Sequence, residues 1–315
     1  MNLIKFLLIT SVIAQTKPRF EIRELSNNQI QQFNENFVTL YKNENFTNFV
    51  KTHSDFFPLI HNTPMFLPFH RLYIKYFEDH FMNNITFGIP YVNWALDAVN
   101  VSNSILFTGK YIGSNDDEGT IKNSVFRNIT LAFPQNEILK RMVNITNGYT
   151  ERIRNAIIRL SSTFSNLSKT MELGIHGLYH SRMTFTMNTV YSPNDPLFFL
   201  HHSFIDKIWY DWQLIHGNAF DTESYNKVPF NKMSLVPYFN ITVLKSLDIS
   251  YLNYTNNSYV NTSVNVIPDK PTNAFLRMNK FTIKEIKDNE IFNLQVSNSH
   301  RNIISILFVF LLIFI

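Results

Sequence analysis

The sequence predicts a mainly α-helical protein, built as a helix bundle with long loops at its rim. Two observations carry this prediction. Apolar residues recur at helical spacing in residues 22–41, 71–82, 151–160, 169–179 and 203–215. Gly, Pro, Asp and Asn concentrate instead in residues 88–130 and 216–260, which we therefore expect to be long connections between helices.

The helices are predicted in chain order from their ends and their apolar faces. Ser26 is a candidate N-cap for the first helix, and Asp195 can cap the turn that leads into the last one. The residues expected to face inward are Ile30, Phe33, Phe37 and Leu40 in the first helix, Leu72, Tyr76 and Phe77 in the second, and Ile205, Ile208, Trp209 and Trp212 in the last. Beyond residue 255 no helical periodicity remains, so an irregular segment or stalk is expected over residues 256–301.

The composition fits one large globular domain and excludes several kinds of site. The chain has 315 residues, of which 45% are hydrophobic and 15% aromatic, and we find no internal repeat or linker that would divide residues 15–255. A net charge of +4 without any block of like charge argues against a nucleic-acid partner. Because there is no cysteine, disulfides, thiolate metal sites and iron–sulfur clusters are excluded, and any metal must be held by His, Asp or Glu.

Both ends of the chain resemble targeting segments. Residues 1–14 combine Lys5, an apolar run and a small residue, Ala14, which is the layout of a secretory signal peptide; the alternative is a buried helix. The apolar tail at 302–315 is short for a membrane-spanning helix and resembles the signal for a GPI anchor, with a tail anchor or a docked strand as alternatives. Ten Asn-x-Ser/Thr sequons lie between the ends, at Asn45, Asn84, Asn100, Asn128, Asn144, Asn166, Asn240, Asn253, Asn256 and Asn261. We expect a glycoprotein that is secreted or held at the cell surface, with membrane attachment through the tail.

The histidines are the most informative residues for function. Seven of the ten fall in two clusters about a hundred residues apart, namely His53, His61 and His70, and then His176, His180, His201 and His202. Neutral imidazole is a good ligand for copper, zinc, iron and nickel, and three imidazoles leave a coordination position open for a small molecule. A single histidine in such surroundings would usually be an ordinary core residue, but two matched clusters favour a metal site.

The second cluster has helical spacing. Glu172, His176 and His180 stand at i, i+4 and i+8, so on a helix they share one face, and Glu172 could support a ligand or act as a base. No Glu lies between the two histidines, which excludes the zinc-peptidase motif. Adjacent residues on a helix point about 100° apart, so either His201 or His202, but not both, can complete this site.

These strings resemble the tyrosinase family of type-3 copper proteins, which includes tyrosinases, catechol oxidases and molluscan haemocyanins. Residues 61–78, HNTPMFLPFHRLYIKYFE, resemble the copper A signature, with Phe69 at the usual Trp position. HGLYH at 176–180 and SPNDPLFFLHHSFIDKIW at 192–209 resemble the copper B signature. IPYVNWALD at 89–97 is similar to the family's PYWDW segment, and the resemblance extends over residues 19–255.

The resemblance implies a four-helix bundle that holds a dicopper centre. It assigns one copper to His53, His61 and His70 and the other to His176, His180 and His202, which leaves His201 in support. It also implies that Phe198 packs over the site and that Arg71, Asp195 and Asp206 tie the helices together. The implied activity is copper-dependent oxidation of a small phenol by O2, with Glu172 as the candidate that assists removal of the phenolic proton.

Two departures from the family pattern bear on activity. Leu59 stands where many members have a Cys crosslinked to the second copper A histidine, so no thioether can form. Gly177 follows His176 where many efficient monophenol hydroxylases have Asn. The resemblance therefore implies hydroxylation of monophenols less directly than oxidation of o-diphenols to o-quinones. The alternatives to a phenol oxidase are a haemocyanin-like oxygen binder and a catalytically silent surface glycoprotein.

Overall fold

A computed structural model describes residues 17–249 apart from 83 and 226–228, and it also describes two short strands at 281–283 and 294–296. The expected signal peptide at 1–14 and the apolar tail at 302–315 lie outside the described residues, as does most of the expected stalk at 256–301. Among the helices that are described, none has the length and apolar character needed to cross a membrane.

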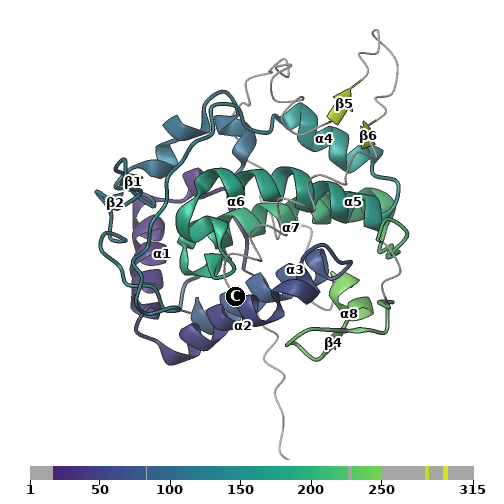
Figure 1. The fold of residues 1–315 in the computed structure, drawn as a ribbon, viewed down its shortest axis with the longest axis horizontal. Helices are drawn as coiled ribbons and strands as arrows, with labels where there is room; N and C mark the ends of the chain where they lie inside the picture. Colours follow the sequence, from purple (N-terminus) through teal and green to yellow (C-terminus); the bar gives the residue numbers. More distant parts are fainter. Residues whose placement is uncertain (1–16, 83, 226–228, 250–280, 284–293, 297–315) are drawn as a thin grey trace, which may run out of the picture.

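The described part of the chain is mainly helical, which confirms the predicted fold class (Figure 1). Its α-helices are α1 Asn27–Leu40, α2 Glu44–Ile60, α3 Phe66–Phe81, α4 Glu151–Leu160, α5 Phe164–Met171, α6 Gly177–Met183, α7 Pro196–His216 and α8 Val243–Leu247. Three antiparallel strand pairs accompany them, β1 Ser114–Asn115 with β2 Ile121–Lys122, β3 Leu235–Val236 with β4 Ile241–Thr242, and β5 Phe281–Ile283 with β6 Leu294–Val296. Short 3-10 helices occupy Ile22–Glu24, Trp94–Asp97, Val101–Asn103, Ile105–Phe107, Phe185–Asn188 and Ser192–Asn194.

Helix α7 is the centre of the bundle. It packs against α3 and α4, and α2 packs against α3 (Figure 1). Every residue of α7 from Pro196 to Gln213 is buried except Asp211, so its polar residues, such as Asp206, need partners inside the protein. The clustered histidines lie on or at the ends of four helices, α2, α3, α6 and α7.

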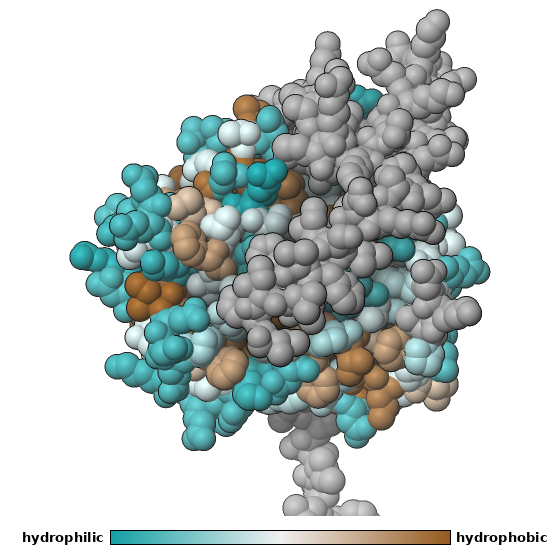
Figure 2. Space-filling model, viewed as in Figure 1, coloured by the Kyte–Doolittle hydropathy of each residue, from teal (hydrophilic) through white to brown (hydrophobic). Residues whose placement is uncertain are grey.

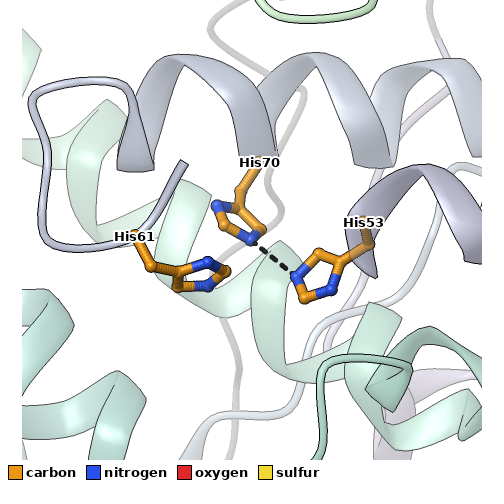
Figure 3. A group of neighbouring side chains, drawn as sticks. All are labelled: His53, His61 and His70. Carbon is orange, nitrogen blue, oxygen red and sulfur yellow. Dashed lines mark hydrogen bonds between the residues drawn. The ribbon is translucent and has the colours of Figure 1, made fainter. Parts of the chain in front are cut away.

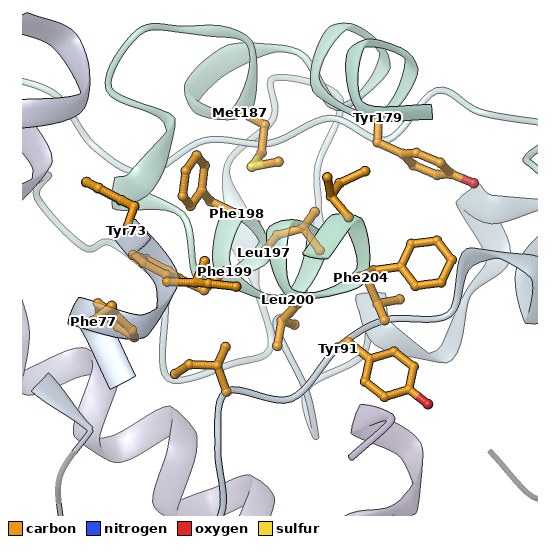
Figure 4. Packing of buried hydrophobic residues seen from close by; sticks show 14 of the residues in the cluster. Tyr73, Phe77, Tyr91, Tyr179, Met187, Leu197, Phe198, Phe199, Leu200 and Phe204 are labelled. Carbon is orange, nitrogen blue, oxygen red and sulfur yellow. The ribbon is translucent and has the colours of Figure 1, made fainter. Parts of the chain in front are cut away.

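An aromatic core holds α1, α3 and α7 together. The rings of Phe77 and Phe199 stack with centroids 3.7 Å apart (Figure 4). The ring of Phe37 packs 5.6 Å from each of them. Aromatic pairs of this kind contribute about 1 kcal/mol beyond the burial of their area. Outside this core the visible face of the molecule is largely hydrophilic, and its hydrophobic residues form small separate groups (Figure 2).

The helices whose N-caps were predicted begin at those caps, whereas a helix predicted only from its apolar pattern begins earlier than expected. Ser26 caps α1, with a reciprocal bond between its main chain and Gln29, and Asp195 caps α7 by accepting from the amide of Leu197 at 2.9 Å. Helix α3 begins at Phe66, five residues before the predicted start at 71, because its first turn is apolar and buried and has no polar cap to mark it.

Helix α2 lies outside the ranges in which helices were predicted, and Pro58 within it would ordinarily indicate a turn before His61. The helix continues through Pro58 to Ile60, and His61 is its C-cap. Proline removes one backbone hydrogen bond of a helix, and in the last turn on an exposed side this loss is tolerated. His61 thus lies just beyond the last turn of the helix that carries His53, and the two rings lie 5.2 Å apart between centroids.

A buried network of charges fixes α3 to α7. The guanidinium of Arg71 donates to Asp206 at 2.5 Å, and Arg19 bonds to Asp206 at 3.1 Å and to Glu78 at 3.0 Å. These charges are almost completely buried, so each depends on its partners. Arg71 follows His70 directly, and Asp206 lies one turn after His202, so the network sets how two of the candidate ligands face each other.

Candidate metal centre

The structure gathers six histidines into two groups of three at the middle of the bundle. His53, His61 and His70 form the first triad, and His176, His180 and His202 form the second. Within each triad one nitrogen per residue can be chosen so that all lie within 4.8 Å of one another. Five of the six side chains are buried, and His180 is partly exposed.

The first triad is built from two helices and the turn between them (Figure 3). His53 lies on α2, His61 follows the end of α2, and His70 lies in the second turn of α3. The imidazole of His70 bonds through Nδ1 to the carbonyl of Phe66 one turn earlier, at 2.8 Å. The imidazole of His53 reaches further, to the carbonyl of Val190 at 2.6 Å.

The second triad contains a departure from the expected α-helical spacing. Residues Glu172–His176 form one π-helical turn between α5 and α6, and His180 follows on α6. Such widened turns interrupt α-helices most often at functional sites. The rings of His176 and His180 still meet at 4.5 Å, and His202 approaches them from α7.

Hydrogen bonds to the main chain fix the protonation of four triad members. Nδ1 of His53, His70, His176 and His180 each faces a backbone carbonyl, at 2.6, 2.8, 3.3 and 2.6 Å respectively. A carbonyl oxygen can only accept, so the proton of each neutral ring lies on Nδ1 and the lone pair on Nε2. These rings therefore present their Nε2 atoms as ligands.

The Nε2 atoms are spaced as a shared ion requires. Nε2 of His53 lies 3.4 Å from Nε2 of His70, the contact drawn as a dashed line in Figure 3, and Nε2 of His180 lies 3.2 Å from Nε2 of His202. Two nitrogens bound to one ion at about 2.0 Å with a tetrahedral angle lie about 3.3 Å apart. Nε2 of His176 is buried without a hydrogen-bond partner among the described residues, which a metal ion would satisfy. The donor set fits two ions.

Burial keeps the triads uncharged. Desolvation lowers the pKa of His53 to about 3 and that of His180 to about 4, and it lowers the pKa values of His61, His70, His176 and His202 well below the usual value. Neutral imidazole is the form that binds metal, so the site needs no proton release from these residues near pH 7.

The two triads face each other. The ring of His70 stacks on that of His202 with centroids 4.4 Å apart, and His61 lies 5.8 Å from His176. Phe198, the aromatic expected to pack over the site, is fully buried, and its ring lies 4.1 Å from His202 and 5.3 Å from His53. Phe198 therefore supports one ligand of each triad from inside the core.

Two neighbours of the second triad have support roles in the structure. The indole Nε1 of Trp94, in the segment 89–97, donates to Nδ1 of His201 at 3.0 Å, and His201 lies outside both triads. The carboxylate of Glu172 accepts from the amide of Asn62 at 2.7 Å. Burial raises the pKa of Glu172 to about 8. Glu172 thereby connects the turn after His61 to the helix turn that carries His176.

Several supporting groups carried no signal in the sequence. The carbonyls of Met187 and Val190, in the connection between α6 and α7, hold one histidine of each triad. Arg141 forms a two-pronged bond to Asp195 at 2.8 and 2.9 Å and so anchors the start of α7. Main-chain atoms are not distinguished by residue type, and Arg141 is distant in sequence from its partner.

Residues 43–215, more than half of the sequence, match the model of a protein family described as the common central domain of tyrosinase. The chain belongs to the tyrosinase family. This confirms the resemblance, and together with the two triads it identifies the cofactor as a pair of copper ions that use O2. The six triad histidines would hold these ions, three to each.

Individual tyrosinase-family relatives are distant. Hemocyanin 2 of Megathura crenulata is 25% identical over 251 residues, which are 70% of this chain but only 7% of that protein. The tyrosinase of Streptomyces lincolnensis is 26% identical over 204 residues, 53% of this chain and 72% of that one. Among solved structures, a functional unit of octopus hemocyanin has a similar fold, with a TM-score of 0.56 and 21% identity over 78% of this chain and 68% of that one.

Proposed function

We propose that the protein is a copper-dependent phenol oxidase, which uses O2 to hydroxylate monophenols, to oxidise o-diphenols to o-quinones, or both. The observation that carries the proposal is the complete set of six neutral imidazoles in two facing triads. Relatives named tyrosinase support it. The partial exposure of His180 also supports it, because a phenol must reach the second triad from solvent.

The copper pair, when bound, supplies the electron transfers between O2 and the phenol. The protein then has to orient the ring and remove the phenolic proton, since a free phenol with a pKa of about 10 keeps its proton at neutral pH. Glu172, whose buried carboxyl accepts from the amide that follows His61, is the proposed proton acceptor in its ionised form. This is the minor form at pH 7, because burial raises the pKa of Glu172 to about 8. Leu59 and Leu173, both substantially exposed, offer apolar surface next to His61 and Glu172 in the sequence.

A haemocyanin-like oxygen carrier is the second candidate. It is favoured by the similarity to two molluscan haemocyanins, one in sequence and one in fold. The two functions use the same dicopper site and differ in whether a phenol is turned over. A direct assay therefore has to measure O2 uptake and quinone formation on the same sample.

The test is to load the purified protein with copper and follow O2 consumption and quinone absorbance with catechol and with a monophenol. The proposal expects catechol turnover that His202→Ala abolishes, while His80→Ala, on the exposed side of α3, leaves it intact. Reversible O2 uptake without quinone would replace the proposal with an oxygen carrier. Two bound coppers with neither property would indicate a silent glycoprotein.

We also propose that the chain enters the secretory pathway and acts at the cell surface or outside the cell. The sequons at Asn45, Asn84, Asn128 and Asn144 support this, because all four side chains are exposed. The check is the electrophoretic mobility of the expressed protein before and after treatment with an N-glycosidase. Release of the protein from membranes by a phospholipase would identify the tail at 302–315 as the signal for a lipid anchor.

A further inference from the structure

The six triad histidines are not held in the same way. Four of them are fixed by an Nδ1 hydrogen bond to a backbone carbonyl. The other two, His61 and His202, are buried, and their Nδ1 atoms have no hydrogen-bond partner of ordinary geometry among the described residues. A metal ligand whose ring is free to rotate binds its ion less tightly, so these two rings need another kind of support.

His202 has that support from its surroundings on α7. Its ring contacts those of Phe198, one turn earlier on α7, and of His70 on α3, with centroids at 4.1 and 4.4 Å. The helix backbone and two flanking rings leave this imidazole little freedom.

His61 is in a weaker position. It is the C-cap of α2, its backbone is already extended, and the next residue, Asn62, has a positive φ of 55° (Figure 3). The helix ends before this residue, and its Nδ1 makes no hydrogen bond of ordinary geometry, although the carbonyl of Phe57 acts electrostatically on the ring. The support that the structure provides is the ring of Phe57, one turn earlier on α2, which stacks on His61 with centroids 4.1 Å apart and an interplanar angle of 23°.

Phe57 also contacts a second ligand of the same triad. Its ring meets that of His53 edge-on, with centroids 5.9 Å apart. The amide of His61 donates to the carbonyl of Phe57 at 3.1 Å, so the main chain brings the two rings into register. Phe66 approaches His61 from α3 at a longer distance, 6.0 Å.

We propose that Phe57 is a positioning residue that orients the imidazole of His61 by stacking and so determines how tightly the first triad binds copper. Stacking here takes the place of the Nδ1 hydrogen bond that the other two ligands of the triad possess. The proposal rests on the copper cofactor and not on phenol oxidation, so copper affinity tests it whether or not the protein turns over a phenol.

The experiment measures copper(I) affinity at each triad separately, without O2, by competition with a chromogenic chelator. Combining His180→Ala with His202→Ala disables the second triad and leaves the first as the measured site. In this background Phe57→Leu, which keeps apolar bulk but has no ring, is expected to weaken copper binding about tenfold, and Phe57→Tyr is expected to stay close to the parent value. Phe56→Leu is the matched control, because Phe56 is a partly exposed neighbour on α2 with no ring contact to the triads among the described residues.

The reverse background, His53→Ala with His70→Ala, reports the second triad. There Phe57→Leu is expected to leave copper affinity unchanged. Equal copper affinity of Phe57→Leu and its parent at the first triad would overturn the proposal, and so would an equal loss at both triads, which indicates a general structural defect. Circular dichroism and urea unfolding of the metal-free variants show that each is folded before titration.

Discussion

The bond between Arg141 and Asp195 anchors the start of α7, the helix that carries His202 of the second triad. Asp195 caps α7 through the amide of Leu197 and accepts two bonds from Arg141, and both charged side chains are buried. Asp195→Ala removes the cap, which costs about 1 kcal/mol, and leaves the buried guanidinium unpaired, which costs about 3 to 5 kcal/mol. We expect a loss of about 4 to 6 kcal/mol, a large share of the roughly 5 to 15 kcal/mol that stabilises a typical domain.

Urea unfolding of the metal-free protein, followed by circular dichroism, measures this loss. Asp195→Asn keeps a side-chain oxygen for the cap and is expected to lose less than Asp195→Ala. Adding Arg141→Met to Asp195→Asn removes the unpaired charge, so the double variant should be more stable than the sum of the two single losses predicts. Additive losses, or a loss below about 1 kcal/mol for Asp195→Ala, would refute the assignment of this pair as a buried anchor.

Three further predictions concern the histidines. His202→Ala is expected to bind one copper instead of two, by elemental analysis after dialysis, and an unchanged count would contradict the ligand assignment. Trp94→Phe deletes the donor to His201 and should lower the free energy of unfolding by about 1 to 2 kcal/mol, whereas no change would mean that this bond contributes nothing net. The metal-free protein should lose stability as pH falls below about 6.5. Burial lowers the pKa of His53 to about 3 and that of His180 to about 4, so in this pH range the unfolded chain binds protons that the folded protein does not bind. His53 alone contributes about 4 kcal/mol to this loss by pH 3, and a urea midpoint that is constant from pH 7 to 5 would exclude it.

The candidate site could be predicted from residue types and motifs. Six histidines in two clusters, without cysteine, pointed to imidazole ligands, and the two copper signatures divided them into the triads that the structure brings together. The cap at Ser26 and the range of α4 also agree with the prediction, because capping chemistry and a strongly amphipathic face are local properties of the chain.

Three features could not be predicted because they depend on packing in the folded protein as well as on the local sequence: helix α2, the π-helical turn and the stacking of Phe57 on His61. Pro58 predicts a break, but the chain around it is held as helix because Phe46, Phe49 and Val50 bury the earlier turns of α2. The π turn at Glu172–His176 leaves no mark in an i, i+4 pattern, which suits an ordinary helix equally well. In the sequence, Phe57 and His61 are only two residues at a spacing of four. Their stacking depends on the fold, as does the lack of a well-formed hydrogen bond at Nδ1 of His61.

The connection between α6 and α7 touches both halves of the copper centre within four residues. Met187 holds His180, Val190 holds His53, and Asn194 closes the same segment through bonds to Tyr191 and Phe133. Adding or deleting one residue here would displace two ligands belonging to different ions at once. The length of this connection is thus constrained by two histidines that lie in different triads.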